Sequence, residues 1–387
     1  MNRHITLLVI SFTALFAVQK FESSKICKTC HPLIYREYSD SMHRKSSIYN
    51  DKVHRAVWNM HPLKKKRKYN CATCHSPSDR KLIEALKDGR PALPEKGEIQ
   101  KYEPIGCTYC HRIERIEHGK KANINIVSEK SRLYYAAKNG RTEKSVVKYH
   151  KTSDMMGLGK SSEGSPFHTI DYGNVNFSNG RMCLGCHEFK KNSKGFPVCS
   201  MDLERSKNGK RNCITCHMPQ VEGPISTLSG EKSHAYHGFS GLHNRPELLA
   251  DWVKLKVKSD SAGKLMVVLK NEADHTLFAH PLRLAQLRVT VKRGAEEFKL
   301  PPVEFFTVLG KDGRPAMPWA AETVLKQNRI EAHESLKIDF DFNLERGDRV
   351  KAVLGYYIVN PKAAKKLGIE KGRLTEFHTL KTERFTF

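Results

Sequence analysis

Two cysteines three positions apart, with a histidine directly after the second, recur five times in this 387-residue chain. The cysteine pairs are Cys27 and Cys30, Cys71 and Cys74, Cys107 and Cys110, Cys183 and Cys186, and Cys213 and Cys216, and the histidines that follow them are His31, His75, His111, His187 and His217. This pattern is typical of covalent attachment of c-type haem, in which the two thiols add across the vinyl groups of one porphyrin. The adjoining histidine then becomes the proximal ligand of the iron. The sequence therefore predicts five covalently attached haem c groups.

Zinc sites and disulfides are the other structures that paired cysteines form. A zinc ribbon needs four ligands for each metal and does not require a histidine after every pair. Disulfides are common in exported proteins, but they leave the five histidines unexplained. Haem attachment accounts for ten of the eleven cysteines, and Cys199 is left over. A leftover cysteine in an exported chain is a reactive thiol or, as the simpler interpretation, a buried inert one.

The first residues have the form of an export signal. A short basic start precedes an apolar run from Ile5 to Val18, and polarity returns at Gln19 and Lys20. The run is too short to span a bilayer comfortably, which favours a secretory signal over a membrane helix. We expect residues 1–21 to be a signal peptide, with an uncleaved anchor that associates with a membrane as the alternative. Because bacteria attach haem outside the cytoplasm, we expect a periplasmic or otherwise exported protein.

The chain is strongly basic. Lysine and arginine number 67 against 41 aspartate and glutamate residues, which gives a formal net charge of +26. Such a charge steers acidic partners and anionic substrates toward the protein. Nucleic acid is the usual partner of a basic protein, but an export signal and haem motifs argue against it. The basic run Lys64–Lys68 is most simply a solvated loop, and a docking patch for a redox partner is the sharper interpretation.

The composition changes near residue 245 and divides the chain into two parts. All five motifs lie in residues 22–244, where the porphyrins would supply most of the apolar bulk and we expect short helices and long loops. Residues 245–387 contain no cysteine and carry short alternating apolar runs with turn signals between them. The expected strands are 252–258, 265–269, 287–291, 303–309, 336–342 and 350–358. The predicted fold class is α+β, a haem-packed domain of short helices and long loops followed by an antiparallel β-sandwich domain.

Each haem iron has a second axial position, and histidines are abundant in the same part of the chain. Several of them follow or precede a motif closely, or share a face of a predicted helix with another histidine. The histidines that we predict as distal ligands are His43, His54, His61, His168 and His237. A lone histidine is more often a surface or hydrogen-bonded residue, but five irons that need partners change that balance. Two histidines on each iron give low-spin haems that suit electron transfer, whereas a methionine would raise the potential.

The segment from the first motif to His43 resembles the opening of known multihaem cytochromes. It runs from Cys27 through Ile34–Tyr38 to Ser41 and Met42, as in cytochromes related to the tetrahaem cytochromes of ammonia oxidisers and to hydroxylamine oxidoreductase. In that group a histidine in the position of His43 is a distal ligand, which the resemblance implies here.

A second resemblance lies in the predicted sandwich. Asn271 and His275 are similar to an element of multihaem cytochromes with a C-terminal sandwich, in which the histidine reaches a haem. The proline and glycine that usually follow that histidine closely are missing here, and a hydrogen-bonded turn histidine is the alternative.

The preferred hypothesis is an exported pentahaem c-type cytochrome that transfers electrons along closely packed bis-histidine haems in anaerobic respiration. Its expected partners are redox proteins with acidic docking surfaces, a membrane quinol dehydrogenase or other cytochromes, and we predict no catalytic residue. The alternative is an enzyme in which one haem lacks a distal ligand and acts on nitrite, hydroxylamine or a sulfur oxyanion. Cys199 motivates the sulfur variant. Pentahaem nitrite reductases commonly carry one motif that ends in lysine, so five histidine endings weigh against nitrite reduction.

Overall fold

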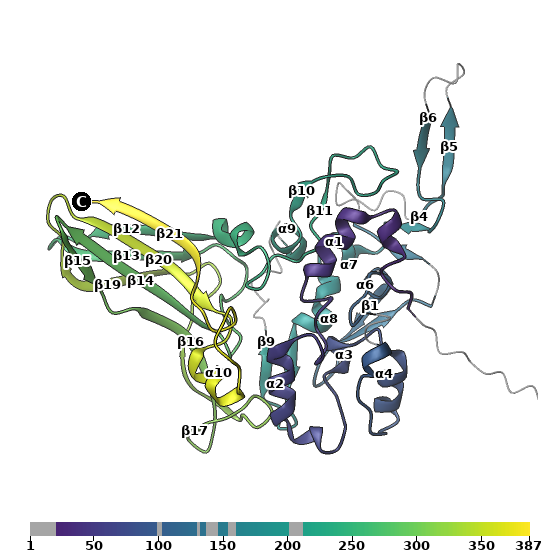
Figure 1. Cartoon of the computed structure of the whole chain (residues 1–387), viewed down its shortest axis with the longest axis horizontal. Coiled ribbons are helices and arrows are strands. Elements are labelled where there is room, and N and C mark those ends of the chain that lie inside the picture. Colours follow the sequence, from purple (N-terminus) through teal and green to yellow (C-terminus); the bar gives the residue numbers. More distant parts are fainter. Residues whose placement is uncertain (1–20, 99–102, 130–131, 137–145, 154–159, 201–211) are drawn as a thin grey trace, which may run out of the picture.

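The computed structural model of the chain describes residues 21–98, 103–129, 132–136, 146–153, 160–200 and 212–387. All of the predicted export signal except Phe21 therefore lies outside the described residues. Among the residues described, none of the helices combines the length and the apolar character that a membrane span requires. Figure 1 shows a region of short helices and small hairpins beside a region of long strands.

The N-terminal region is built from helices of one to two turns. The α-helices are α1 (Pro32–Asp40), α2 (Lys52–Met60), α3 (Ala72–His75), α4 (Arg80–Lys87), α6 (Cys107–Cys110), α7 (Val175–Ser178), α8 (Leu184–His187) and α9 (Cys213–His217), and the 3-10 helices are η1 (Cys27–Thr29), η2 (Pro62–Lys64) and η3 (Arg181–Cys183). Pro32 occupies the first turn of α1, where its missing N–H costs nothing. The Asp51 carboxylate caps α2 by accepting hydrogen bonds from the N–H groups of Val53 and His54.

Each attachment motif coincides with a short helical turn. The N–H of His31 donates to the carbonyl of Cys27 at 2.8 Å, and the N–H of His75 donates to that of Cys71 at 2.9 Å. A single turn places the first cysteine and the histidine, four residues apart, on the same side of the chain. The local fold thus presents a thiol and the imidazole of one motif on one side of the chain, as attachment to a single porphyrin would require.

Small two- and three-stranded sheets connect these turns. Their strands are β1 (Ile113–Glu117), β2 (Ile124–Val127), β3 (Leu133–Tyr134), β4 (Val146–Val147), β5 (His150–Ser153), β6 (Lys160–Glu163), β7 (Ile170–Asp171), β8 (Phe189–Lys191), β9 (Pro197–Ser200), β10 (Gln220–Glu222) and β11 (Ser233–Ala235). Most are two to four residues long, which is too short for an alternating pattern to be recognised in the sequence. The expectation of long loops therefore missed these hairpins.

The C-terminal region contains two antiparallel sheets. One has the order β12 (Val253–Ser259), β13 (Lys264–Asn271), β19 (Ser335–Asn343), and the other is built from β14 (Leu284–Arg293), β15 (Glu296–Lys299), β16 (Val303–Lys311), β17 (Arg314–Pro315), β18 (Thr323–Asn328), β20 (Arg349–Tyr357) and β21 (His378–Thr386). The 3-10 helix η5 (Pro246–Trp252) leads into β12, and α10 (Pro361–Leu367) lies between β20 and β21. All six strands expected from the sequence are present, with ends that differ by no more than three residues.

The core of the C-terminal region lies between its two sheets. Residues of β12 alternate between buried and exposed, because successive side chains of a strand point to opposite faces. Leu265 and Leu269 of β13 pack with Leu287 of β14 and Leu354 of β20, and all four are 0% exposed. The predicted α+β class with a C-terminal sandwich is therefore confirmed.

Hydrogen bonds join the two regions at several points. The amide of Asn192 donates to the carbonyls of Pro318 at 3.0 Å and Ala321 at 2.7 Å. The hydroxyl of Tyr356 in β20 donates to the carbonyl of Leu242 at 2.8 Å. The β-sandwich is thus packed against the motif-bearing region, so it is in a position to contribute side chains to it.

Candidate haem-binding site

Four of the five motif histidines are oriented by a hydrogen bond from Nδ1 to a backbone carbonyl. The pairs are His31 with Ile225 at 2.8 Å, His75 with Ser46 at 3.2 Å, His111 with Tyr134 at 2.7 Å, and His217 with Ser240 at 2.6 Å. Because a carbonyl only accepts, Nδ1 carries the proton and Nε2 keeps its lone pair. This is the tautomer that a metal at Nε2 requires, and the hydrogen bond also fixes the ring orientation.

Four of the motif histidines face a second histidine at nearly the same separation. The distances between ring centres are 6.2 Å for His31 and His168, 6.0 Å for His187 and His43, 6.3 Å for His111 and His237, and 6.2 Å for His217 and His275. A metal–imidazole bond is about 2 Å long and the ring centre lies about 1 Å behind the nitrogen, so two imidazoles on one metal have centres about 6 Å apart. The observed spacing therefore fits one metal between each pair.

Burial keeps these facing histidines neutral. Burial, followed by the charge of His187, lowers the pKa of His43 to about 3. Burial also lowers the pKa of His237 to about 3, with the charge of His111 as the next cause. A neutral imidazole is the form that binds a metal, so both side chains are ready to act as ligands at neutral pH.

A carboxylate on α1 holds the segment that carries His237. Glu37 accepts the N–H of His237 at Oε2 over 2.9 Å, and its Oε1 lies 3.1 Å from Nε2 of the buried His234. The Nδ1 of His237 donates to the carbonyl of Ala235, which leaves Nε2 for a metal. His43 follows the same helix, and its ring meets Phe239 edge-on at 4.1 Å. Helix α1 therefore helps to position two facing histidines.

A buried asparagine holds His275. The side chain of Asn271, at the end of β13, is 0% exposed and donates to the carbonyls of His275 and Glu331, both at 2.9 Å. Nδ1 of His275 bonds the carbonyl of Thr276 at 3.0 Å, so Nε2 again keeps its lone pair. The β-sandwich thus places a histidine opposite His217 of the motif-bearing region.

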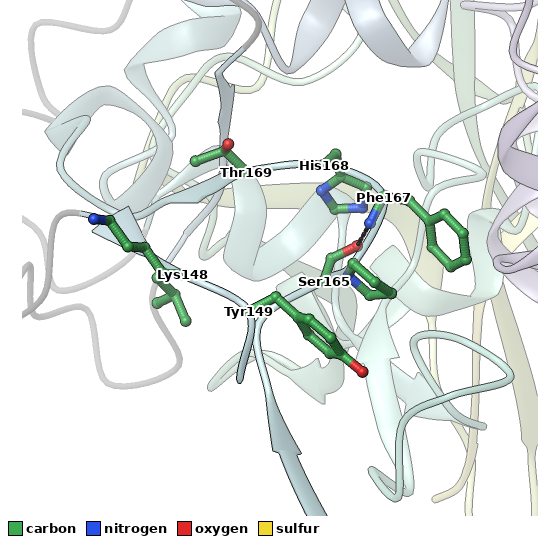
Figure 2. Close-up of a pocket in the computed structure, with 8 residues that line it drawn as sticks. Lys148, Tyr149, Ser165, Phe167, His168 and Thr169 are labelled. Carbon is green, nitrogen blue, oxygen red and sulfur yellow. Dashed lines mark hydrogen bonds between the residues drawn. The ribbon is translucent and has the colours of Figure 1, made fainter. Parts of the chain in front are cut away.

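His168 lies beside a surface hollow of about 330 Å³, shown in Figure 2. The hydroxyl of Ser165 accepts the N–H of Phe167 at 3.2 Å, which makes a tight turn just before His168. The ring of His168 stacks at 5.9 Å on Tyr135, with 20° between the planes. Burial lowers the pKa of His168, which keeps it neutral opposite His31. The exposed Phe167 and Tyr149 line the same hollow.

His75 is different from the other four motif histidines. In the described part of the chain, the histidine ring in contact with His75 is that of His54. The two ring centres are 4.0 Å apart, which is too close for a metal between them. Both imidazoles approach the carbonyl of Ser46 through Nδ1, at 3.2 Å for His75 and 3.0 Å for His54. His54 therefore packs against the side of His75 instead of facing it.

His61 also faces no motif histidine in the described structure. It ends α2, stacks on Trp58 at 5.6 Å and lies 4.9 Å from Trp319 of the β-sandwich. Its Nδ1 accepts the N–H of Leu63 at 3.1 Å, so the proton is on Nε2. The lone pair of Nδ1, which could bind a metal, is occupied by this hydrogen bond. The roles of His54 and His61 as ligands stay predictions, and the geometry favours neither.

The motif thiols show which attachment sites are neighbours. Thiols from different motifs lie close enough to shift one another's pKa: Cys107 lowers the pKa of Cys27, Cys186 that of Cys74, and Cys183 that of Cys213. Cys110 raises the pKa of Cys183 and Cys186. The first motif is therefore beside the third, the second and fifth are beside the fourth, and the third and fourth are close. Five attachment sites thus lie in one connected array.

The two other uses of cysteine find less support in the geometry. All ten motif cysteines are free thiols. Within the ranges that the structure describes, no group of three or more His, Cys, Asp or Glu side chains is arranged around a common point for a metal ion. Paired thiols with paired imidazoles fit haem c, whose porphyrin supplies the remaining four iron ligands. Cys199 lies in β9 opposite Lys190, and its side chain is outside the described structure.

Comparisons with known proteins agree with this interpretation. The family model described as cytochrome c554 and c-prime matches residues 26–112, which contain the first three motifs. Among solved structures, the crystal structure of a penta-heme cytochrome c552 from Thermochromatium tepidum is similar, with a TM-score of 0.68 and 21% sequence identity over 94% of this chain and 98% of that chain. No curated protein matches the chain. At this identity the structural match shows a shared fold.

The partial family match and the shared fold agree with the expectation of a multihaem c-type cytochrome. The resemblance to hydroxylamine oxidoreductase stays a prediction. Of the predicted distal ligands, the structure brings His43, His168 and His237 opposite motif histidines. It also brings His275 there, which only the resemblance had indicated. The sequence signal for His275 was its position four residues after Asn271, an asparagine that turns out to be buried.

Proposed function

We propose that the chain is an exported pentahaem c-type cytochrome that transfers electrons in anaerobic respiration. The observation that carries the proposal is the set of four histidine pairs at ring separations of 6.0 to 6.3 Å, each with one member from an attachment motif. Two strong ligands on an iron leave no position for a substrate and favour electron transfer. Haem c, when bound, supplies a one-electron iron couple, and the chain sets its position and potential.

The residues of this chain position the porphyrins, orient the imidazoles and set the strength of the imidazole donors. The ten motif thiols fix the position of the porphyrins, and the hydrogen bonds from Nδ1 fix the orientation of the motif imidazoles. A hydrogen bond from Nδ1 makes an imidazole a stronger donor to iron. His43 lacks such a partner within the described residues, and its Nδ1 is buried. We therefore infer a weaker donor, and hence a higher potential, at the iron between His187 and His43 than at the one between His111 and His237.

The connected array of motifs supports transfer over a distance. The first and third sites form one end, the fourth site is the junction, and the second and fifth sites branch from it. An electron entering at one end would therefore have two exits. The basic run Lys64–Lys68 lies just before the second motif, and Lys64 to Arg67 are exposed. We infer that an acidic redox partner docks there, since its charge complements a chain of net charge +26.

Haem content and spin state test this proposal directly. The purified protein is expected to contain five haems, and its oxidised EPR spectrum is expected to be dominated by low-spin signals. A potentiometric titration should resolve several one-electron steps over a broad, mostly negative range. Fewer than four low-spin haems, or one narrow step at positive potential, would contradict the electron-transfer proposal.

A second function is favoured by the environment of His75. The absence of a facing histidine at about 6 Å in the described residues makes the second site the candidate for an open iron. We infer as the alternative an oxidoreductase that binds nitrite, hydroxylamine or a sulfur oxyanion at that site. A high-spin EPR signal from one haem that shifts when nitrite or sulfite is added supports it. Turnover of sulfur substrates that is unchanged in Cys199→Ser excludes a role for that thiol.

A further inference from the structure

A group of cationic side chains lies where the β-sandwich meets the motif-bearing region. Arg283, just before β14, donates from Nη1 to the carbonyl of Ile358 at 3.0 Å, and its Nη2 lies 3.4 Å from Nε2 of His243. Arg373 donates to the carbonyl of His243 at 2.7 Å. Burial, followed by the charges of Arg283, Arg373 and His280, lowers the pKa of His243 to about 3. These side chains are therefore close neighbours.

This group offers hydrogen-bond donors, and no carboxylate in the described part of the chain forms an ion pair with it. Nε2 of His243 accepts from Arg283, so its proton is on Nδ1. Nδ1 of His280 accepts the N–H of Leu282 at 3.2 Å, so its proton is on Nε2. Within the described residues, no carboxylate forms an ion pair with Arg283. The acidic group that acts on it from a distance, Asp51, already caps α2.

A buried guanidinium without a counter-ion is costly. Arg283 is half-buried, and burial lowers its pKa to about 10. Removing one charge of a pair from the interior leaves the other uncompensated, which is strongly destabilising. Protein interiors therefore retain such a charge where something anionic meets it. The missing partner must accept hydrogen bonds from a guanidinium and from imidazole N–H groups.

His280 shows where that partner would lie. Burial lowers the pKa of His280 to about 4, yet its imidazole surface is exposed. The motif histidine His187 has the same combination of deep burial and exposed surface. The surface of His280 is therefore of the kind that a porphyrin would cover.

The two chain segments that carry His243 and His280 each begin near one pair of facing histidines. The carbonyl of Ser240 accepts the hydrogen bond from His217, and His243 lies three residues further along. His275 faces His217, and His280 lies five residues after it. We propose that Arg283, His243 and His280 form a site for an oxyanion, and the geometry points to a propionate carboxylate of the haem held between His217 and His275. This inference rests on the proposed haem binding.

A carboxylate fits the donors of this site. A guanidinium binds a carboxylate through two parallel N–H bonds, and charge-assisted bonds of this kind are about twice as strong as neutral ones. Nδ1–H of His243 and Nε2–H of His280 supply two more donors. A free phosphate or sulfite would use the same donors, so the chemistry of the site is shared and the experiment must separate the two sources.

The test compares Arg283→Gln with Arg288→Gln in the full-length, haem-loaded protein. Arg288 is a matched control because it lies in β14, is exposed, and donates to Gln286 and Tyr357 outside the cationic group. Loss of a positive charge beside a haem favours the ferric form. We therefore expect Arg283→Gln to move one redox step to lower potential, Arg288→Gln to move none, and Arg283→Lys to stay close to the parent protein.

The remaining outcomes distinguish the sources and the premises. If inorganic phosphate does not change the redox potentials of the parent protein, while Arg283→Gln lowers one of them, the bound anion is a haem carboxylate. A saturable shift with phosphate that Arg283→Gln abolishes identifies a free oxyanion in the same site. If the protein contains five haems but neither Arg283→Gln nor His280→Leu changes the potentiometric titration curve, the inference is overturned and the proposed function stands. Absence of haem overturns both. His280→Leu serves as the test if Arg283→Gln does not fold.

Discussion

The imidazoles of His217 and His275 face each other at 6.2 Å with 18° between their planes, although they come from different regions of the molecule. His217 ends an attachment motif in α9, whereas His275 follows β13 of the sandwich. In the proposed function, this pair bridges two regions and makes the sandwich part of the redox unit. The sandwich would then close one iron site, in addition to any docking role.

Replacement of His275 by alanine is expected to convert one haem from low-spin to high-spin. The thioether bonds to Cys213 and Cys216 do not depend on His275, so the haem count should stay at five. His333→Ala is the control, because His333 pairs with the neighbouring Asp274 at 2.8 Å and faces no motif histidine. EPR of the oxidised proteins measures the change. Five low-spin haems in His275→Ala would contradict the assignment of this ligand.

Replacement of Glu37 by glutamine is expected to disturb the segment of His237 without removing a ligand. The carboxylate bonds the N–H of His237 and lies beside His234. Loss of a charge-assisted hydrogen bond costs about 1.5–3 kcal/mol. We expect a loss of about 2 kcal/mol in the free energy of unfolding and altered low-spin g-values for one haem. Asp40→Asn in the same helix is the control, since that side chain is exposed, and no change in g-values would exclude a positioning role for Glu37.

The sequence identifies the attachment motifs and the sandwich strands because both depend on local patterns. Five repeats of one spacing define the motifs, and side-chain alternation defines strands such as β12, whose lysines are exposed and whose valines are buried. The edge strand β18 was missed because all of its residues are exposed, so its sequence carries no alternation. The last strand, β21, was missed for a similar reason, since none of its residues is fully buried.

The pairing of the histidines is not a local property and could not be predicted. His43 follows the first motif but faces His187, and His168 precedes the fourth motif but faces His31. Such pairs depend on how distant segments pack. The sequence argument placed His54 and His61 on one helix face, and α2 does contain His54. The face turns toward His75 and Trp319 at packing distances that leave no room for a metal.

Replacement of Asn271 by alanine tests how the sandwich positions its ligand. The buried amide donates to three carbonyls, those of His275, Ile330 and Glu331, and its oxygen accepts the N–H of Ala273. Leaving a buried polar group without a partner costs about 1–3 kcal/mol. We expect a loss of about 3 kcal/mol by chemical denaturation.

A spin-state readout separates positioning from mere stability in Asn271→Ala. A mixture of low-spin and high-spin signals from one haem is expected, because the segment of His275 loses its anchor. Asn328→Ala is the control, since that side chain bonds the carbonyl of Glu304 at the exposed edge of the sandwich. A destabilised protein with five unaltered low-spin signals would show that Asn271 supports the fold and not the ligand.

Replacement of His61 by phenylalanine decides between the sequence hypothesis and the geometry. As a ligand, His61 would close the iron at His75, and its loss would create a high-spin haem. The structure instead uses it as an aromatic contact for Trp58 and Trp319, with Nδ1 accepting the N–H of Leu63. Phenylalanine keeps the aromatic contact and removes the nitrogen atoms. We therefore expect an unchanged EPR spectrum, with a loss of about 1 kcal/mol for the missing cap. His61→Ala should cost more, because it also removes the contact with Trp319. A new high-spin signal in His61→Phe would restore His61 as a ligand and close the site that the alternative function requires.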